Sequence, residues 1–120
     1  MKILIIEDDT LISKMYSEKF SRDGFEVEVA RHGQDGLEKL KARPPDLVIL
    51  DIMMPGISGL QVVDEMKRDP RLEKIPIIVL SNLSEQEDID KAKKRGVNEY
   101  LIKSDLDPED VSLAVKKYLK

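Results

Sequence analysis

Two short apolar runs, each followed directly by acidic residues, constrain the fold of this chain more than any other feature. The runs are residues 3–6 and 47–50, and neither contains a polar residue. Such runs are typical of strands that are buried on both faces of a parallel sheet. The acids that follow them are Glu7, Asp8, Asp9 and Asp51. Because ligands of an open parallel sheet bind at the carboxyl ends of its strands, neighbouring strands would bring these carboxylates into one site.

A group of neighbouring carboxylates must protonate, separate or bind a cation. Two like charges about 4 Å apart repel by roughly 4 kcal/mol at an effective dielectric near ~20. Oxygen atoms alone would form the ligand set, which favours a hard cation. The sequence therefore predicts a Mg²⁺ site at this edge of the sheet.

Strand and helix patterns alternate five times along the chain, with no repeat and no low-complexity linker. The expected strands are residues 2–7, 25–29, 47–50, 75–80 and 97–102. The expected helices are residues 10–22, 34–42, 59–68 and 84–95, and a last helix that begins near residue 108. Polar and apolar residues alternate in residues 25–29, which predicts an edge strand. Regular alternation with right-handed crossovers predicts an α/β fold with a doubly wound parallel sheet.

Two of the expected helices differ in their apolar faces. The helix at residues 10–22 is expected to bury Leu11, Ile12, Met15, Tyr16 and Phe20. In the helix at residues 84–95, Ser84 and Glu87 have the spacing of a capping box. The apolar anchors of this second helix are only Ile89 and Ala92. Most of its surface is therefore expected to face water or a partner.

Composition limits the functions that this chain can have. Its 120 residues are enough for one domain with a hydrophobic core. The absence of cysteine excludes disulfides, zinc–thiolate sites and thiol nucleophiles. A net charge of −4 argues against a general nucleic-acid surface. No apolar stretch has the ~18 residues of a membrane span, and the first strand leaves no room for a signal peptide, so we expect a cytoplasmic protein.

Two more polar residues follow strands at the same edge of the sheet. Ser81 follows the apolar residues 77–80, and Lys103 follows residues 100–102. Together with the acids, they make the chain resemble the receiver domains of two-component response regulators, the CheY-like family. The resemblance covers residues 1–120 as one receiver (response regulatory) domain. It implies a flavodoxin-like (βα)5 fold with a doubly wound five-stranded parallel sheet of strand order 2-1-3-4-5.

The resemblance also implies a role for each residue at this edge. Asp51 resembles the phosphoacceptor of the family, a carboxylate that becomes an aspartyl phosphate. The implied Mg²⁺ ligands are Glu7, Asp8, Asp51 and the backbone carbonyl of Met53. The implied phosphoryl-binding and switch residues are Ser81, Lys103 and Tyr100. The residues implied to modulate hydrolysis and access are Met53, Asn82 and Leu83.

Membership of this family would also imply how the chain acts. It would be a phosphorylation-dependent signalling switch of a two-component phosphorelay. The domain would catalyse its own phosphorylation and dephosphorylation, but it would not be a conventional enzyme. Its phosphodonor would be a sensor histidine kinase or a phosphotransfer protein. It would then signal to a downstream protein target through the face formed by residues 84–95, residues 97–102 and the last helix. No direct binding to nucleic acid or to a membrane is expected of this domain.

Some positions depart from the usual pattern of the family. Ser104 follows Lys103 where proline is usual. A cis peptide without proline costs about 2.5–4 kcal/mol, which argues against the family's cis bond at this place. Asn82 stands where a smaller residue is usual and is expected to narrow access for donors or water. Met53 and Leu83 are apolar at positions that govern water access, so we expect slow hydrolysis of the aspartyl phosphate.

Two other functions fit the sequence poorly, and a third stays open. A flavodoxin-like cofactor carrier would need a phosphate-binding loop rich in glycine, serine and threonine after the first strand, where this chain has acids. A hydrolase with an aspartyl-phosphate intermediate would place its nucleophile after the first strand and would need a cap. A receiver that signals without phosphate is suggested by Asn82 and Ser104.

Asp9 is expected to cap the helix at residues 10–22, and His32, the one histidine, to be a solvated surface residue.

Overall fold

The computed structural model describes residues 1–119. Within them, five parallel strands form one sheet in the order β2-β1-β3-β4-β5, which confirms the expected flavodoxin-like order. The strands are β1 (Lys2–Ile6), β2 (Glu26–Ala30), β3 (Leu47–Leu50), β4 (Ile77–Ser81) and β5 (Glu99–Ile102). The helices are α1 (Thr10–Arg22), α2 (Gly33–Ala42), α3 (Gly59–Arg68), α4 (Gln86–Lys94) and α5 (Pro108–Tyr118), with a 3₁₀ turn, η1 (Lys103–Asp105).

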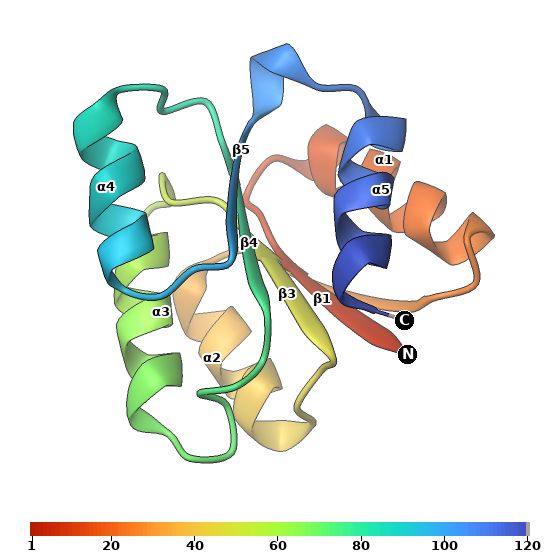
Figure 1. The fold of residues 1–120 in the computed structure, drawn as a ribbon. Helices are drawn as coiled ribbons and strands as arrows, with labels where there is room; N and C mark the ends of the chain where they lie inside the picture. Colours follow the sequence, from red (N-terminus) through yellow and green to blue (C-terminus); the bar gives the residue numbers. More distant parts are fainter. Residues whose placement is uncertain (120) are drawn as a thin grey trace.

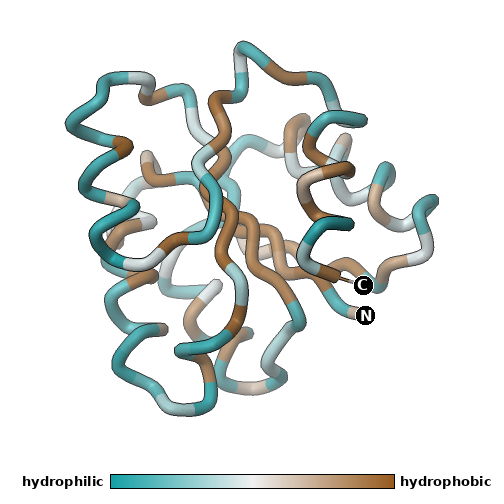
Figure 2. Tube along the Cα trace, viewed as in Figure 1, coloured by the Kyte–Doolittle hydropathy of each residue, from teal (hydrophilic) through white to brown (hydrophobic). Residues whose placement is uncertain are grey.

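Helices cover both faces of the sheet, α1 and α5 on one and α2, α3 and α4 on the other (Figure 1). The core beneath α1 and α5 includes Ile3, Ile5, Phe20, Val111 and Val115. The core beneath α2, α3 and α4 includes Leu4, Ile6, Leu40, Met66 and Ala92. Every residue of β1, β3 and β4 is buried, as their unbroken apolar runs predict. Figure 2 shows this apolar centre, with hydrophilic residues on the outer sides of the helices.

Among the helices of residues 1–119, none combines the length and the hydrophobicity that a membrane crossing requires. The strand β2 lies at one edge of the sheet, as its alternating sequence predicts.

The expected apolar face of α1 is only partly correct. Tyr16 and Phe20 are buried, and their rings stack with centroids 5.8 Å apart. Leu11 and Met15, however, are 81% and 42% exposed. Each lies two positions along the helix from the buried Ser13. With ~3.6 residues per turn, two positions are about 200° around the helix axis, so Leu11 and Met15 lie on the side opposite Ser13. The prediction was wrong for these two residues because the sheet covers a narrower arc of α1 than its apolar side chains span.

The predicted start of α4 was also wrong. The helix begins at Gln86, and its N-cap residue, Glu85, makes no side-chain cap hydrogen bond. Ser84 and Glu87 therefore form no capping box, because residues 82–85 are a loop rather than the first turn of a helix. The strands β4 and β5 each begin two residues later than predicted. The start of α4 depends on the loop at the carboxyl edge of the sheet, whereas the starts of β4 and β5 depend on the loops at the opposite edge.

Candidate functional site

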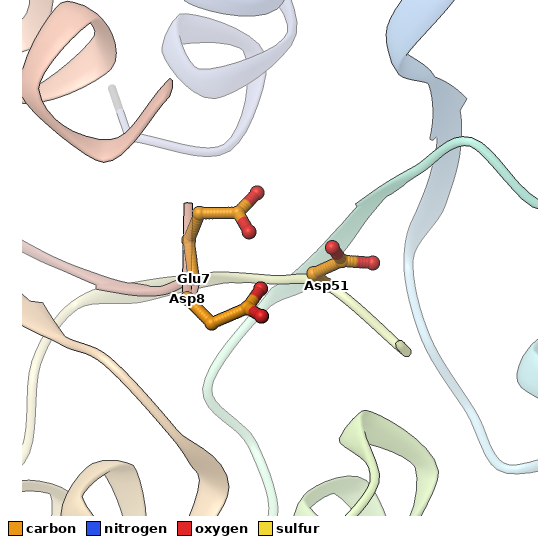
Figure 3. A group of neighbouring side chains, drawn as sticks. All are labelled: Glu7, Asp8 and Asp51. Carbon is orange, nitrogen blue, oxygen red and sulfur yellow. The ribbon is translucent and has the colours of Figure 1, made fainter. Parts of the chain in front are cut away.

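The ends of β1 and β3 place three carboxylates together. The two strands pair in parallel with Ile6 opposite Leu50, so the next residues, Glu7 and Asp51, leave the sheet side by side. Figure 3 shows Glu7 and Asp8 extending from the end of β1 towards Asp51. One carboxylate oxygen of each of these three residues lies within 4.8 Å of the others. The strand ends thus bring three of the four acids that follow β1 and β3 into one group.

The backbone around Asp51 is held firmly against the start of α3. The N–H of Met53 donates to Oδ1 of Asp51 at 3.2 Å. Helix α3 can begin at residue 59 because glycine has no Cβ. A Cβ there would collide with the carbonyl oxygen of Asp51 and the backbone of Ile52. The role of Gly59 was not predicted from the sequence. The capping box at residues 58–61 is the signal that could have found it, because it marks where α3 meets the site.

Lys103 brings a positive charge into this group from the turn η1. Its Nζ lies 2.5 Å from Oε1 of Glu7 and 2.9 Å from Oδ2 of Asp51. Glu7 is only 4% exposed and Asp51 only 7% exposed. Burial lowers the pKa of Lys103, but its hydrogen bonds to both carboxylates outweigh burial, so that its pKa is raised overall. Burial also raises the pKa of Glu7, although the bond from Lys103 opposes this shift. All peptide bonds within residues 1–119 are trans, including the bond to Ser104.

Ser81 and Tyr100 meet at the loop after β4. Ser81 is fully buried, and its Oγ accepts the N–H of Leu83 at 3.2 Å. The hydroxyl of Tyr100 donates to the carbonyl of Leu83 at 2.6 Å, and burial raises the pKa of this hydroxyl. Leu83 is therefore held from both sides, by a strand-end hydroxyl and by a half-buried tyrosine. Asn82 in this loop and Met53 after β3 are both exposed.

Asp9 and His32 each cap a helix rather than joining the carboxylate group. Oδ1 of Asp9 accepts the N–H groups of Leu11 and Ile12 at 3.0 and 3.1 Å, which confirms the expected N-cap of α1. His32 is exposed, as expected. Its Nδ1 also accepts the N–H of Asp35 at 3.3 Å, a capping role in α2 that the sequence analysis did not predict.

The carboxylate group has the donor chemistry of a Mg²⁺ site. The side chains of Glu7, Asp8 and Asp51 offer only oxygen, the ligand that hard cations prefer. These three carboxylates and the ammonium of Lys103 leave a charge of −2 when all are ionised (−3 and +1), which one divalent cation neutralises. The residues present therefore fit a divalent cation with oxygen ligands.

Comparison with known proteins agrees with this geometry. Residues 3–116 match the family model of the response regulator receiver domain. This chain belongs to the response regulator receiver family. The receiver domain is 32% identical over 108 residues to the phosphate regulon transcriptional regulatory protein PhoB of Rhizobium meliloti. It is 29% identical over 117 residues to the polar-differentiation response regulator DivK of Brucella anthropi.

These relatives differ in length. The matches cover 90% of this chain and 48% of PhoB, but 98% of this chain and 94% of DivK. The receiver domain thus spans about half of PhoB and nearly all of DivK. Solved structures resemble it along almost its whole length. The chemotaxis protein CheY4 of Vibrio cholerae superposes with a TM-score of 0.91 and 26% identity, with 98% of this chain and 97% of that chain covered. The phosphorylated cyanobacterial phytochrome response regulator RcpA has a TM-score of 0.86 and 30% identity, with 99% and 94% covered.

Proposed function

We propose that this receiver domain is a phosphorylation-dependent switch that accepts a phosphoryl group on Asp51. The observation that carries the proposal is the position of Lys103, whose ammonium lies 2.9 Å from Asp51 and 2.5 Å from Glu7. A carboxylate that attacks a charged phosphoryl group needs its electrostatic repulsion cancelled, and a partly buried lysine beside the nucleophile can do so.

The chain's own groups suggest how the transfer proceeds. An oxygen of Asp51 forms a bond to phosphorus while the bond from phosphorus to the leaving group breaks. Oδ1 accepts the N–H of Met53, and Oδ2 accepts the ammonium of Lys103, so the carboxylate is held in one orientation. Mg²⁺, when bound by Glu7, Asp8, Asp51 and the carbonyl of Met53, supplies further neutralisation of phosphoryl charge.

The response to phosphorylation follows from the loop after β4. A phosphoryl group carries about −1.5 to −2 charges and three acceptor oxygens. Ser81 and Lys103 are the donors at the strand ends that can turn towards it. A shift of Ser81 disturbs its contact with Leu83, which Tyr100 also holds. The helix after this loop, α4, has Ala92 as its buried residue, so we expect its movement to need little free energy.

The proposed partners are those that receiver domains pair with. The phosphodonor is a sensor histidine kinase or a phosphotransfer protein, and the signal passes to a downstream protein through the face of α4, β5 and α5. Direct binding to nucleic acid or to a membrane is not part of the proposed function. The domain modifies itself rather than turning over a pool of substrate, so it is not a conventional enzyme. A cytoplasmic location suits an intracellular phosphodonor.

Intact-mass measurement tests the proposal. The protein is incubated with Mg²⁺ and acetyl phosphate as wild type, Asp51→Asn and Asp9→Asn. We expect one added phosphoryl group in the wild type and in Asp9→Asn, which keeps a side chain able to cap α1. We expect none in Asp51→Asn, and none in the wild type without Mg²⁺. A folded wild type that binds Mg²⁺ but gains no mass would favour a receiver that signals without phosphate.

A further inference from the structure

Tyr16 of α1 is a buried residue whose hydroxyl the proposed phosphoryl chemistry does not use. The residue is only 3% exposed, and its ring stacks on that of Phe20 with 5.8 Å between the centroids. No hydrogen bond joins its hydroxyl to another of residues 1–119, whereas the hydroxyls of Tyr100 and Tyr118 both donate to oxygen atoms. The hydroxyl of a buried tyrosine usually has a hydrogen-bond partner. The unpaired hydroxyl of Tyr16 therefore points to a partner in another state of the protein.

The side chain of Tyr16 lies against the carboxylate group. Together with Glu7 and Asp51, it lines a small cavity of about 10 Å³ beneath α1, at the ends of β1, β3 and β4. Within residues 1–119, every side-chain nitrogen or oxygen that is fully buried has a hydrogen-bond partner. The small exposed part of Tyr16 therefore includes its hydroxyl. The ring is packed behind the carboxylates, and the hydroxyl lies at the molecular surface.

One neighbouring group has a donor to spare for this hydroxyl. Burial raises the pKa of Tyr16, and among the charges that act on its hydroxyl the ammonium of Lys103 has the largest effect. Two acids that also act on it, Asp107 and Asp110, already accept each other's backbone N–H in the capping box of α5. Lys103 has three N–H donors and uses two of them on the carboxylates of the site. Its third donor is therefore available for the hydroxyl oxygen.

Building on the proposed function, we propose that Tyr16 is a positioning residue for Lys103 in the phosphorylated domain. When the ammonium turns from Glu7 to a phosphoryl oxygen on Asp51, its third N–H donates to the hydroxyl oxygen of Tyr16. The hydroxyl is neutral, so it orients the ammonium and leaves its charge to the phosphoryl group, for which a carboxylate would compete. Stacking on α1 fixes the ring, so the hydroxyl is in place before the phosphoryl group arrives.

The test compares the wild type with Tyr16→Phe and with Tyr118→Phe as a matched control. Tyr16→Phe keeps the stacked ring and removes only the hydroxyl. Tyr118→Phe removes a hydroxyl on α5 that bonds to Glu99 instead of facing the site. With Mg²⁺ and acetyl phosphate, we expect Tyr16→Phe to gain the phosphoryl group about three- to tenfold more slowly than the wild type, the effect of losing one hydrogen bond. Tyr118→Phe should keep the wild-type rate.

Two further measurements separate positioning from a structural role. In the phosphorylated proteins, the ammonium protons of Lys103, followed by ¹⁵N NMR, should exchange with water about threefold or more faster in Tyr16→Phe than in the wild type. Tyr118→Phe should leave this exchange unchanged. Without phosphorylation, Tyr16→Phe should unfold in urea at the wild-type midpoint, because its hydroxyl then makes no hydrogen bond to lose.

The possible outcomes distinguish this inference from the function on which it rests. If the wild type is phosphorylated but Tyr16→Phe matches it in either the rate or the exchange of the Lys103 protons, the inference is overturned. Equal slowing in Tyr16→Phe and Tyr118→Phe would also overturn it, because the effect would then be unrelated to the site. A folded wild type without any adduct would instead overturn the proposed function, and this inference with it.

Discussion

The ammonium of Lys103, which follows β5, lies 2.5 Å from the carboxylate of Glu7, which follows β1, although β3 and β4 lie between these strands in the sheet. We predict that Lys103→Met lowers the free energy of unfolding by about 2–4 kcal/mol in EDTA, because two buried carboxylates lose their partner. Saturating Mg²⁺ should stabilise this variant more than the wild type. Urea unfolding with and without Mg²⁺ measures both effects.

A matched control for this prediction is Lys117→Met. It removes an ion pair with Glu99 in which the lysine side chain is 64% exposed, so only a small loss of stability is expected. Equal losses in the two lysine variants would show that the pairing of Lys103 is no more important than a surface ion pair.

Asp8 and Asp9 are neighbours with different roles, which gives a second prediction. Asp8→Asn should weaken Mg²⁺ binding about tenfold or more, because it removes one of the three carboxylates of the group. Asp9→Asn should change the affinity less than about threefold, since asparagine can still cap α1. Isothermal titration calorimetry of both variants gives the comparison. Similar affinities for the two variants would place the cation elsewhere.

Slow hydrolysis of the aspartyl phosphate is the third prediction. Met53 lies two residues after Asp51 and Leu83 two residues after Ser81, and neither apolar side chain can hold a water molecule for attack on phosphorus. The double variant Met53→Asn, Leu83→Glu should therefore shorten the half-life of the phosphoryl group by about fivefold or more, as general base or water-positioning groups do in catalysis. Loss of the added mass over time after removal of the donor reports the half-life. A half-life as long as that of the wild type would count against this role.

The hydroxyl of Tyr100 gives a fourth prediction, because it donates to Leu83 at 2.6 Å in the loop before α4. Tyr100→Phe should lower the free energy of unfolding by about 1 kcal/mol, the usual contribution of one such hydrogen bond. Amide exchange of residues 82–85 should become faster. Unchanged exchange in this loop would mean that Tyr100 does not hold it.

Acid sensitivity is the fifth prediction, and it depends on Asp23 at the end of α1. A hydrogen bond from the buried Ser112, supported by Lys116 and Lys19, holds the pKa of Asp23 below its usual 3.8. A carboxylate with a lowered pKa stabilises the fold above its usual value and loses this effect as pH falls through the folded-state pKa. Ser112→Ala should therefore reduce stability at about pH 5 and above, and the difference from the wild type should shrink below pH 3.8. Urea unfolding across this range measures the difference, and a constant difference would contradict the assignment.

The sequence by itself determined the strands, the sheet class and the identity of the acids at the site. Residues 3–6 and 47–50 are predicted to be buried strands, because an unbroken apolar run has no face to turn towards water and four residues are too few for a helix. Glu7 and Asp51 follow these runs directly, so the geometry of a parallel sheet places both at its carboxyl edge. These inferences need only local pattern and chain direction.

Only the tertiary structure decided how side chains from distant segments meet. The ion pair of Lys103 with Glu7 depends on the reach of a side chain across two strands. The exposure of Leu11 depends on the arc of α1 that the sheet covers, and the start of α4 depends on a loop. The shallow surface hollow lined by Asp8 and by residues 52–55 depends on the path of the chain between β3 and α3. Packing in three dimensions sets each of these features, because no pattern of neighbouring residues specifies which surfaces will touch.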